Sequence, residues 1–162
     1  EEGQDPTEMK ATGRNPANFP RPSIVRTPDG RIPYQPWARA QRIENRKNFF
    51  EPTELWHMDS NARCLPMGEP RIALDQGFEI VQAPGVVWFH HGYNNFPRAV
   101  YIDGRAPLND RVKLWYGDAI GRWEGNSLVI ASRNHNQAGW YDAYGNFHSN
   151  ELKLDEIGRA HV

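Results

Sequence analysis

Residues 121–130 have the sequence Gly-Arg-Trp-Glu-Gly-Asn-Ser-Leu-Val-Ile, and this stretch decides the fold class. It predicts a β-hairpin, with a short strand, a Glu-Gly-Asn turn, and a second strand in which apolar residues alternate. Glycine and asparagine tolerate the positive φ that a tight hairpin turn demands. Upstream, Pro-Gly, Asn-Asn and Asp-Gly signals bound three further strand-like runs, at residues 78–81, 86–91 and 98–103.

These short alternating runs predict a mainly β fold, either an antiparallel barrel or a strongly curved sheet. One N-terminal helix is expected over residues 36–50, because Pro36 suits the first helical position and Pro52 ends the helix. Trp37 and Ala40 are expected on its apolar face. Residues 61–71 are predicted to form an ordered loop, and residues 103–120 a connection whose Leu114, Trp115 and Tyr116 cover an open end of the barrel.

The two ends of the chain differ from this domain. Residues 1–33 hold six of the 13 prolines and predict an extended arm, which leaves residues 34–155 as a single β-rich domain. Residues 156–162 are expected to be an artefact, because residues 157–162 (Ile-Gly-Arg-Ala-His-Val) match the translated start of a widely used sequencing adapter. The alternative is an ordinary polar C-terminus. A C-terminal truncation would leave an unpaired strand edge, so we predict poor expression or self-association.

Composition limits the classes of partner. The net charge of -1 gives no electrostatic basis for binding nucleic acid. No apolar run approaches the ~20 residues that cross a bilayer. We therefore expect a small-molecule ligand, with no nucleic acid and no membrane span, and the sequence leaves the oligomeric state open. Cys64 is the only cysteine, and a buried structural thiol is favoured over a catalytic one.

Several catalytic patterns are missing. His57, Asp59, His90 or His91, His135 and His148 are conceivable metal ligands, but their spacing matches no established metal motif. Asp142, His148 and Ser149 lack the setting of a catalytic triad, and there is no GxSxG or nucleotide-binding glycine pattern. No metal or cofactor is predicted.

Neighbouring residues in a strand point to opposite faces of the sheet, so His90 and His91 are expected on opposite faces unless a bulge at Gly92 intervenes. His90 would share a face with Val86 and Trp88, and His91 with Phe89. The alternation does not show which of the two faces the interior.

Aromatic side chains interleaved with polar ones predict a pocket for a small organic molecule. The first hypothesis is a protein that binds a small aromatic or hydrophobic molecule, with chemical turnover of that molecule left open and an acidic ligand favoured by a buried arginine. The competing hypothesis is a carbohydrate-binding or protein-interaction module without catalysis, in which the tryptophans spread over an exposed face. The candidate ligand-binding residues are Arg98, Tyr101, His90 or His91 as the polar floor, Arg71 and His148 at the rim, and Trp88, Trp115 and Trp140.

The chain also contains a specific set of short motifs: Arg-Cys-Leu-Pro at 63–66, Pro-Arg at 70–71, Phe-Glu-Ile-Val-Gln at 78–82, Pro-Gly at 84–85, Tyr-Ile-Asp-Gly-Arg at 101–105, Gly-Arg-Trp-Glu-Gly at 121–125 and His-Ser at 148–149. Over residues 27–154 it resembles a large family of uncharacterised exported bacterial proteins. The resemblance implies a periplasmic or secreted, lipocalin-like barrel, and it supplies no mechanism. Many members carry an acidic residue near the position of His90 or His91, so no catalytic role transfers to this site.

Overall fold

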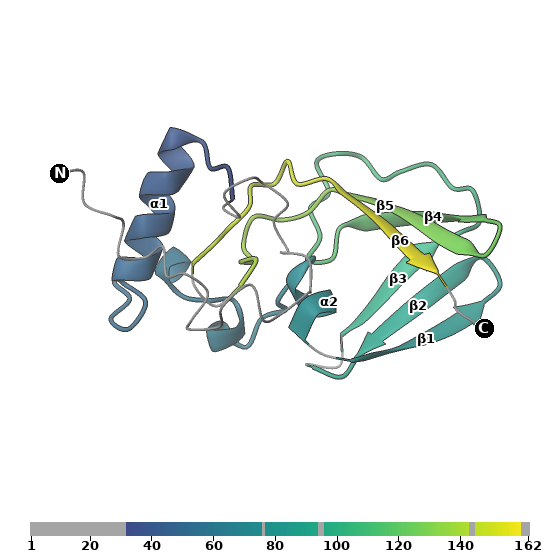
Figure 1. The fold of residues 1–162 in the computed structure, drawn as a ribbon, viewed down its shortest axis with the longest axis horizontal. Coiled ribbons are helices and arrows are strands. Elements are labelled where there is room, and N and C mark those ends of the chain that lie inside the picture. Colours follow the sequence, from purple (N-terminus) through teal and green to yellow (C-terminus); the bar gives the residue numbers. More distant parts are fainter. Residues whose placement is uncertain (1–31, 76, 94–95, 143–144, 160–162) are drawn as a thin grey trace, which may run out of the picture.

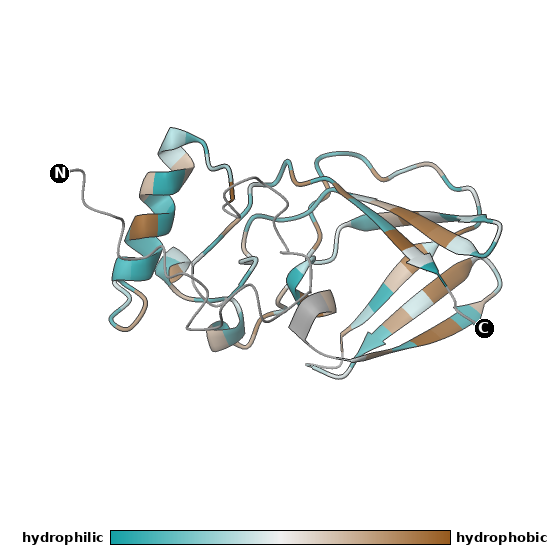
Figure 2. Ribbon diagram, in the orientation of Figure 1, coloured by the Kyte–Doolittle hydropathy of each residue, from teal (hydrophilic) through white to brown (hydrophobic). Residues whose placement is uncertain are grey.

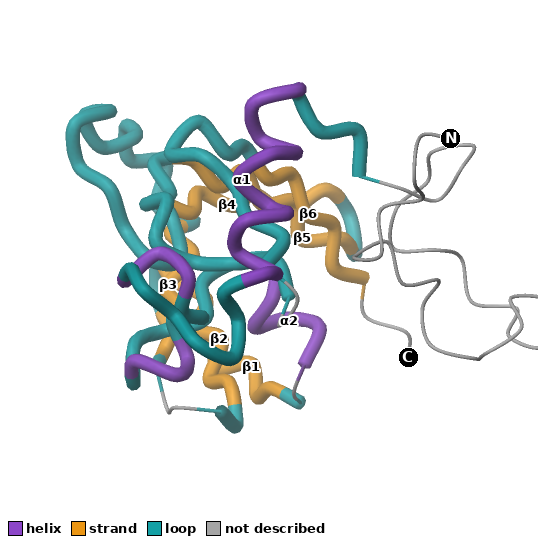
Figure 3. The backbone as a smooth tube through the Cα atoms, turned by 90° about the vertical axis from the view of Figure 1, so that its left-hand side faces the viewer, coloured by secondary structure: helices purple, strands orange, loops and turns teal. Residues whose placement is uncertain are grey.

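The computed structural model describes residues 32–75, 77–93, 96–142 and 145–159. Apart from Ile32 and Pro33, the predicted N-terminal arm lies outside these ranges, as do residues 160–162. The described part of the chain forms one curled sheet, with helices and loops gathered at one end of it (Figure 1). Figure 3 looks onto that end and shows the helices in front of the strands. The chain is mainly β, which confirms the predicted fold class.

In the part of the chain that the structure describes, six strands follow one another across the sheet in chain order. They are β1 (Phe78–Ala83), β2 (Val86–His91), β3 (Pro97–Tyr101), β4 (Asp118–Glu124), β5 (Ser127–Arg133) and β6 (Leu154–Arg159). The sheet curls into a half-barrel with β1 and β6 at its two edges. The segment expected from the sequence to be an artefact thus contributes to β6, whose Glu156 pairs with Ile130 of β5.

The turn chemistry explains two of the connections. Gly125 has φ 58° and, with Asn126, joins β4 to β5 as the sequence predicts. Gly85 has φ 77° and, with Pro84, joins β1 to β2. Both are two-residue hairpin connections in which glycine takes a backbone conformation that other residues rarely adopt.

One pair of strands differs from the antiparallel expectation. β3 and β4 run parallel and pair only through Val100 with Ala119 and Tyr101 with Ile120. The connection between them, residues 102–117, is long enough to return the chain to the end of the sheet where β3 began, which a parallel pair requires. The alternation of apolar residues carries no information on strand direction, so the sequence could not predict this pairing.

The inner face of the sheet changes character along its length. Its apolar core is formed by Val87, Val100, Ala119, Leu128 and Ile130, and Figure 2 shows the brown apolar positions of the strands. Gly121 allows close packing there, since a Cβ at this position would lie 2.8 Å from Val100 Cγ1. Nearer to the helical end, the inner positions of β2, β3 and β5 are polar: His91, Arg98 and Ser132. Glu156 of β6, which pairs with Ile130, adds a carboxylate to this face.

The helical end is built from α1 (Pro36–Lys47), the short 3-10 helices η2 (Leu55–His57) and η3 (Asn61–Arg63), and α2 (Arg71–Asp75). The helix α1 starts at Pro36 as predicted but ends at Lys47 rather than at residue 50. Its buried residues are Ala38 and Asn45, whereas Trp37 and Ala40 are exposed, so the predicted apolar face was wrong. The helix docks through polar contacts, in which Asn45 Nδ2 donates to the Gly145 carbonyl and Arg42 Nε donates to Asn146 Oδ1.

Candidate functional site

Arg98 lies at the centre of the polar end of the inner face. Its guanidinium donates to both carboxylate oxygens of Glu156, with Nη1 at 2.8 Å from Oε2, and to Ser132 Oγ at 2.9 Å. On its other side, Nη1 lies 3.1 Å from Glu69 Oε1. Arg98 is 3% exposed. The bidentate contact with Glu156 and the ion pair with Glu69 compensate the cost of burying its charge.

Glu69 comes from the loop that precedes α2 and is 2% exposed. Burial raises the pKa of its carboxyl from 4.5 to about 7; Arg98 opposes this rise and Glu156 adds to it. Apart from the ion pair with Arg98, neither carboxyl oxygen receives a well-oriented hydrogen bond from the described residues. A carboxyl with a pKa close to neutral can exist in both protonation states under ordinary conditions.

Two aromatic side chains complete this polar cluster. The rings of His91 and Tyr116 stack with centroids 6.4 Å apart. Burial, and then the charge of Glu69, raise the pKa of Tyr116 to about 12. Burial, and then the charge of Arg98, lower the pKa of His91. Among the described residues, neither ring nitrogen of His91 has a hydrogen-bond partner. The Tyr116 hydroxyl has no such partner there either.

Two more histidines lie next to the polar cluster. His135 is fully buried, and burial, followed by the effect of His148, lowers its pKa to about 4. His148 donates from Nδ1 to the Ser149 carbonyl at 3.0 Å, and burial also lowers its pKa. The two ring centroids are 6.4 Å apart. Both imidazoles are therefore neutral at pH 7, which suits them to hydrogen bonding rather than to charge pairing.

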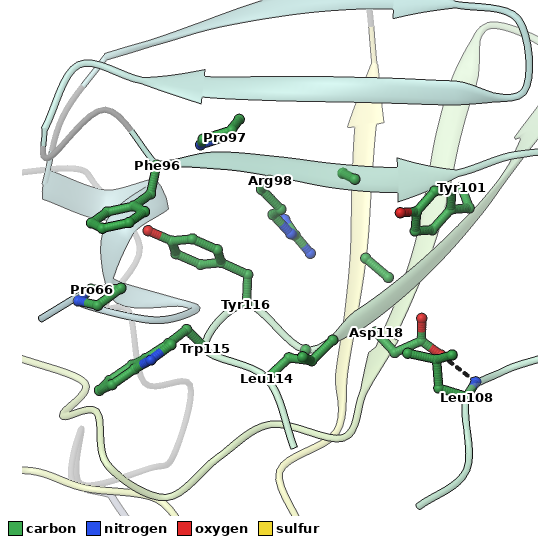
Figure 4. A pocket seen from close by; sticks show the side chains of 13 residues that line it. Pro66, Phe96, Pro97, Arg98, Tyr101, Leu108, Leu114, Trp115, Tyr116 and Asp118 are labelled. Carbon is green, nitrogen blue, oxygen red and sulfur yellow. Dashed lines mark hydrogen bonds between the residues drawn. The ribbon is translucent and has the colours of Figure 1, made fainter. Parts of the chain in front are cut away.

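A pocket of about 360 Å³ opens beside the polar cluster, at the end of the sheet where β3 and β4 are not paired. Arg98 and Tyr116 belong to both the polar cluster and the pocket. Figure 4 shows Arg98 and Tyr101 projecting from β3 and the side chains of Leu114, Trp115 and Tyr116 on the connection before β4. Pro66, Phe96 and Leu108 add apolar wall, and Asp118 accepts a hydrogen bond from the Leu108 backbone N–H at 2.7 Å. We call this space the β3–β4 pocket.

The predicted site residues are distributed over several places. Arg98, Tyr101 and Trp115 line the β3–β4 pocket, and His91 lies in the polar cluster behind it. His91 is buried and His90 is exposed, which resolves the choice between the two. Their opposite faces follow the predicted alternation of β2.

The other predicted residues do not reach this pocket. Trp88 pairs with Ala99 and shares the outer face of the sheet with His90. Arg71 is buried away from the pocket, and its Nη1 donates to Asp59 Oδ1 at 2.7 Å and Oδ2 at 2.8 Å. Trp140 and His148 line a second pocket next to α1. The structure therefore does not bring the three predicted tryptophans together.

Glu69, Tyr116 and Ser132 were not predicted as site residues. The Glu69 signal is weak in sequence: a single carboxyl between Met-Gly and Pro, in a segment expected to be an ordered loop. Tyr116 was predicted only as part of the cover over an open end of the sheet. Ser132 does carry a signal, because it continues the inward series of Leu128 and Ile130 and so places a hydroxyl where the alternation calls for an apolar side chain.

The described residues contain no group of three or more His, Cys, Asp or Glu side chains arranged to hold a metal ion. No helix in the described ranges has both the length and the apolar character to span a membrane. Comparison with protein-family models, with curated proteins and with solved structures found no match for this chain.

Proposed function

We propose that this protein binds a small organic molecule in the β3–β4 pocket. The apolar part of the ligand packs against Leu114 and Trp115, and its polar part forms hydrogen bonds with Tyr116 and the polar cluster. Pockets for small organic ligands have this composition, a mostly apolar wall with a few convergent polar groups.

One observation supports this proposal above the others. Two side chains of the pocket lining, Arg98 and Tyr116, contact two buried groups behind it, Glu69 and His91. Among the described residues, Arg98 Nε, the Tyr116 hydroxyl and both ring nitrogens of His91 have no hydrogen-bond partner, and the Glu69 oxygens have only the ion pair with Arg98. A buried polar group without a partner costs about 1–3 kcal/mol, so native proteins rarely keep several together without a reason. A ligand that carries both donors and acceptors would recover part of this cost on binding.

The charges of the cluster favour a neutral ligand. Glu156 already occupies both terminal nitrogens of the Arg98 guanidinium, and Glu69 lies against Nη1. A ligand carboxylate would have to displace one of these partners and would face two carboxyl groups. We therefore propose a neutral ring that bears a hydroxyl or amide group, in place of the acidic ligand that a free buried arginine would favour.

Glu69 adds the capacity for proton transfer. With a pKa near 7, its carboxyl can accept or donate a proton at neutral pH. Glu69 lies behind Arg98 and is not part of the pocket lining, so proton transfer to a bound molecule would require the side chains between them to shift. Arg98 limits the rise of this pKa and holds Glu69 near enough for its charge to act on the Tyr116 hydroxyl. If the ligand is transformed, acid–base chemistry is the reaction class that Glu69 would support.

The family resemblance supports a location in the periplasm or outside the cell, and a lipocalin-like mode of action in which a curved sheet holds its ligand. Fractionation of cells that express the natural gene tests the location. Recovery of the protein with the cytoplasmic fraction would contradict it.

A thermal-shift titration tests the binding proposal. Phenol, benzyl alcohol and benzamide serve as neutral probes, and benzoate as the charged probe. We expect saturable stabilisation by at least one neutral probe, and an affinity about tenfold lower in Tyr116→Phe, which loses one hydrogen bond and keeps the ring. Tyr93→Phe is the matched control, because its hydroxyl donates to Asn61 Oδ1 at 2.6 Å and does not line the pocket.

Two results would contradict the proposal. One is that none of the neutral probes stabilises the protein. The other is that Tyr116→Phe and Tyr93→Phe bind the neutral probes as well as the parent does. Preferential binding of benzoate would contradict the neutral ligand class and leave the pocket assignment in place.

A further inference from the structure

A second pocket, of about 320 Å³, lies where α1 meets Trp56 and the described residues of the ranges 137–142 and 145–149. We call it the α1 pocket. Its lining shares no residue with that of the β3–β4 pocket. Among the described residues that line it, none is Asp, Glu, Lys or Arg.

Aromatic rings form much of its wall. Trp37 is 63% exposed and Trp56 is 55% exposed, whereas Trp140 is buried. The rings of Trp37 and Phe147 lie 6.1 Å apart at 60°, so their planes are inclined to one another. Tryptophan has a large apolar surface that proteins usually bury, and two tryptophans exposed at one pocket mark it as a binding surface.

A buried amide fixes the orientation of one polar group in the wall. Asn45 is 2% exposed; its Oδ1 accepts a hydrogen bond from Gln41 Nε2 at 3.0 Å, and its Nδ2 donates to the Gly145 carbonyl. Because the Gln41 amide nitrogen is held by Asn45, its amide oxygen is the group left for a ligand. Asn45 thus acts as a positioning residue for Gln41.

A buried imidazole supplies an acceptor on another side of the pocket. His148 is 8% exposed and donates from Nδ1 to the Ser149 carbonyl. This contact requires the proton on Nδ1, so Nε2 carries the lone pair of the neutral ring. The Ser149 hydroxyl and the Gln137 amide belong to the same wall.

We propose that the α1 pocket binds a neutral saccharide ring. The C–H face of a pyranose packs on the electron-rich face of an indole, and its hydroxyl groups donate to Gln41 Oε1 and His148 Nε2. A charged sugar is disfavoured, because the described lining offers no opposite charge to compensate its desolvation. A purely apolar ligand is disfavoured as well, because it would bury the amide and imidazole groups without hydrogen bonds.

The test is a fluorescence titration of the intact chain with methyl α-glucoside, N-acetylglucosamine and cellobiose. Glucuronate is the charged probe, and cyclohexanol is the largely apolar probe, a six-membered carbon ring with a single hydroxyl. We expect saturable binding of at least one neutral sugar, weakened about tenfold or more in Trp37→Ala and in Trp56→Ala. Trp123→Ala is the matched control, because Trp123 is also exposed but lies on β4. Thermal melts verify that each variant is folded.

A fourth variant, Gln41→Leu, separates sugar binding from simple apolar packing. It keeps the volume of the side chain and removes the amide, so it should weaken sugar binding and strengthen cyclohexanol binding. The proposal is overturned if no neutral sugar saturates the signal, if glucuronate or cyclohexanol binds the parent more tightly than the neutral sugars do, or if Trp123→Ala loses as much affinity as the two pocket variants.

Discussion

Among single residues, Glu69 has the most direct influence on the chemistry of the β3–β4 pocket. Its carboxyl is buried against Arg98, its charge acts on the Tyr116 hydroxyl, and its pKa is raised to about 7. The energetic consequence is a dependence of stability on pH. The folded pKa of about 7 exceeds the ordinary value of 4.5. Between pH 4.5 and about 7, the folded protein therefore retains on Glu69 a proton that the unfolded chain releases.

The stabilisation that comes from protonated Glu69 is complete below about pH 4.5 and is lost as the pH rises through about 7. We expect the free energy of unfolding of Glu69→Gln, relative to the parent, to increase over this interval and to level off above it. Urea unfolding of both proteins at a series of pH values measures this difference. His135 has the opposite sign, since its pKa is lowered to about 4 and its contribution is lost as the pH falls below 6.5. The His135 contribution is the same in both proteins and cancels in the comparison. If the difference in unfolding free energy between Glu69→Gln and the parent does not change with pH, the role of Glu69 is contradicted.

Arg98 makes a second prediction possible. Arg98→Met would leave Glu69 and Glu156 without their cation in the interior, and removing one member of a buried ion pair costs about 3–5 kcal/mol. Arg122→Met is the matched control, because Arg122 pairs with Glu124 on the surface, where such a pair is worth about 0–1 kcal/mol. Urea unfolding at pH 7 compares the two variants. Equal losses of stability would show that Arg98 is not the centre of a buried ion network.

Among the elements, the parallel entry into β4 depends on one glycine. Gly117 has φ 68°, and a Cβ there would lie 2.6 Å from both the Arg133 carbonyl oxygen and His135 Cε1. Gly117→Ala combines backbone strain with overpacking, for which we expect a loss of about 2–4 kcal/mol. Gly104 has φ 76° with no atom near its added Cβ, so Gly104→Ala should lose only about 1–2 kcal/mol.

Thermal and urea unfolding of the two alanine variants measure the difference, which is the cost of crowding the Arg133 carbonyl oxygen and the His135 ring. Losses that are the same in both variants would mean that the contact between Gly117 and His135 is loose.

The sequence predicted the elements that depend on local chemistry. The Gly125 turn and the alternation in β5 follow from residues that are close together in the chain, and so does the start of α1 at Pro36. It could not predict the parallel pairing of β3 with β4, or the docking of α1 through Asn45, because these depend on contacts between distant segments. The same holds for the site: Arg98 was predicted, but its partner Glu69 lies in a loop with no distinctive pattern.

At the scale of the whole fold, the described strands leave two edges of the sheet, β1 and β6, that are not paired with each other. Ile80 and Val81 on β1 and Ile157 on β6 are exposed. Exposed apolar edges favour pairing between chains, so self-association stays a prediction. Val81→Lys, which places a charge on the β1 edge, should reduce the mass measured by light scattering at equal concentration. A parent protein that is already monomeric would contradict this prediction.

The β3–β4 pocket is assembled from the loop before α2, from β3, and from the connection to β4, and only the folded sheet brings these segments together. The most direct test of ligand binding in this pocket is an NMR titration. It follows the backbone amides, the tryptophan indoles and the arginine Nε–H groups. The ligand is the tightest of phenol, benzyl alcohol and benzamide. We predict saturable shifts at Arg98 Nε, at the Trp115 indole and at the amides of Tyr116 and Gly117. Shifts confined to α1 or to the sheet edges, or no shifts at the highest ligand concentration, would contradict the claim that this pocket is the binding site.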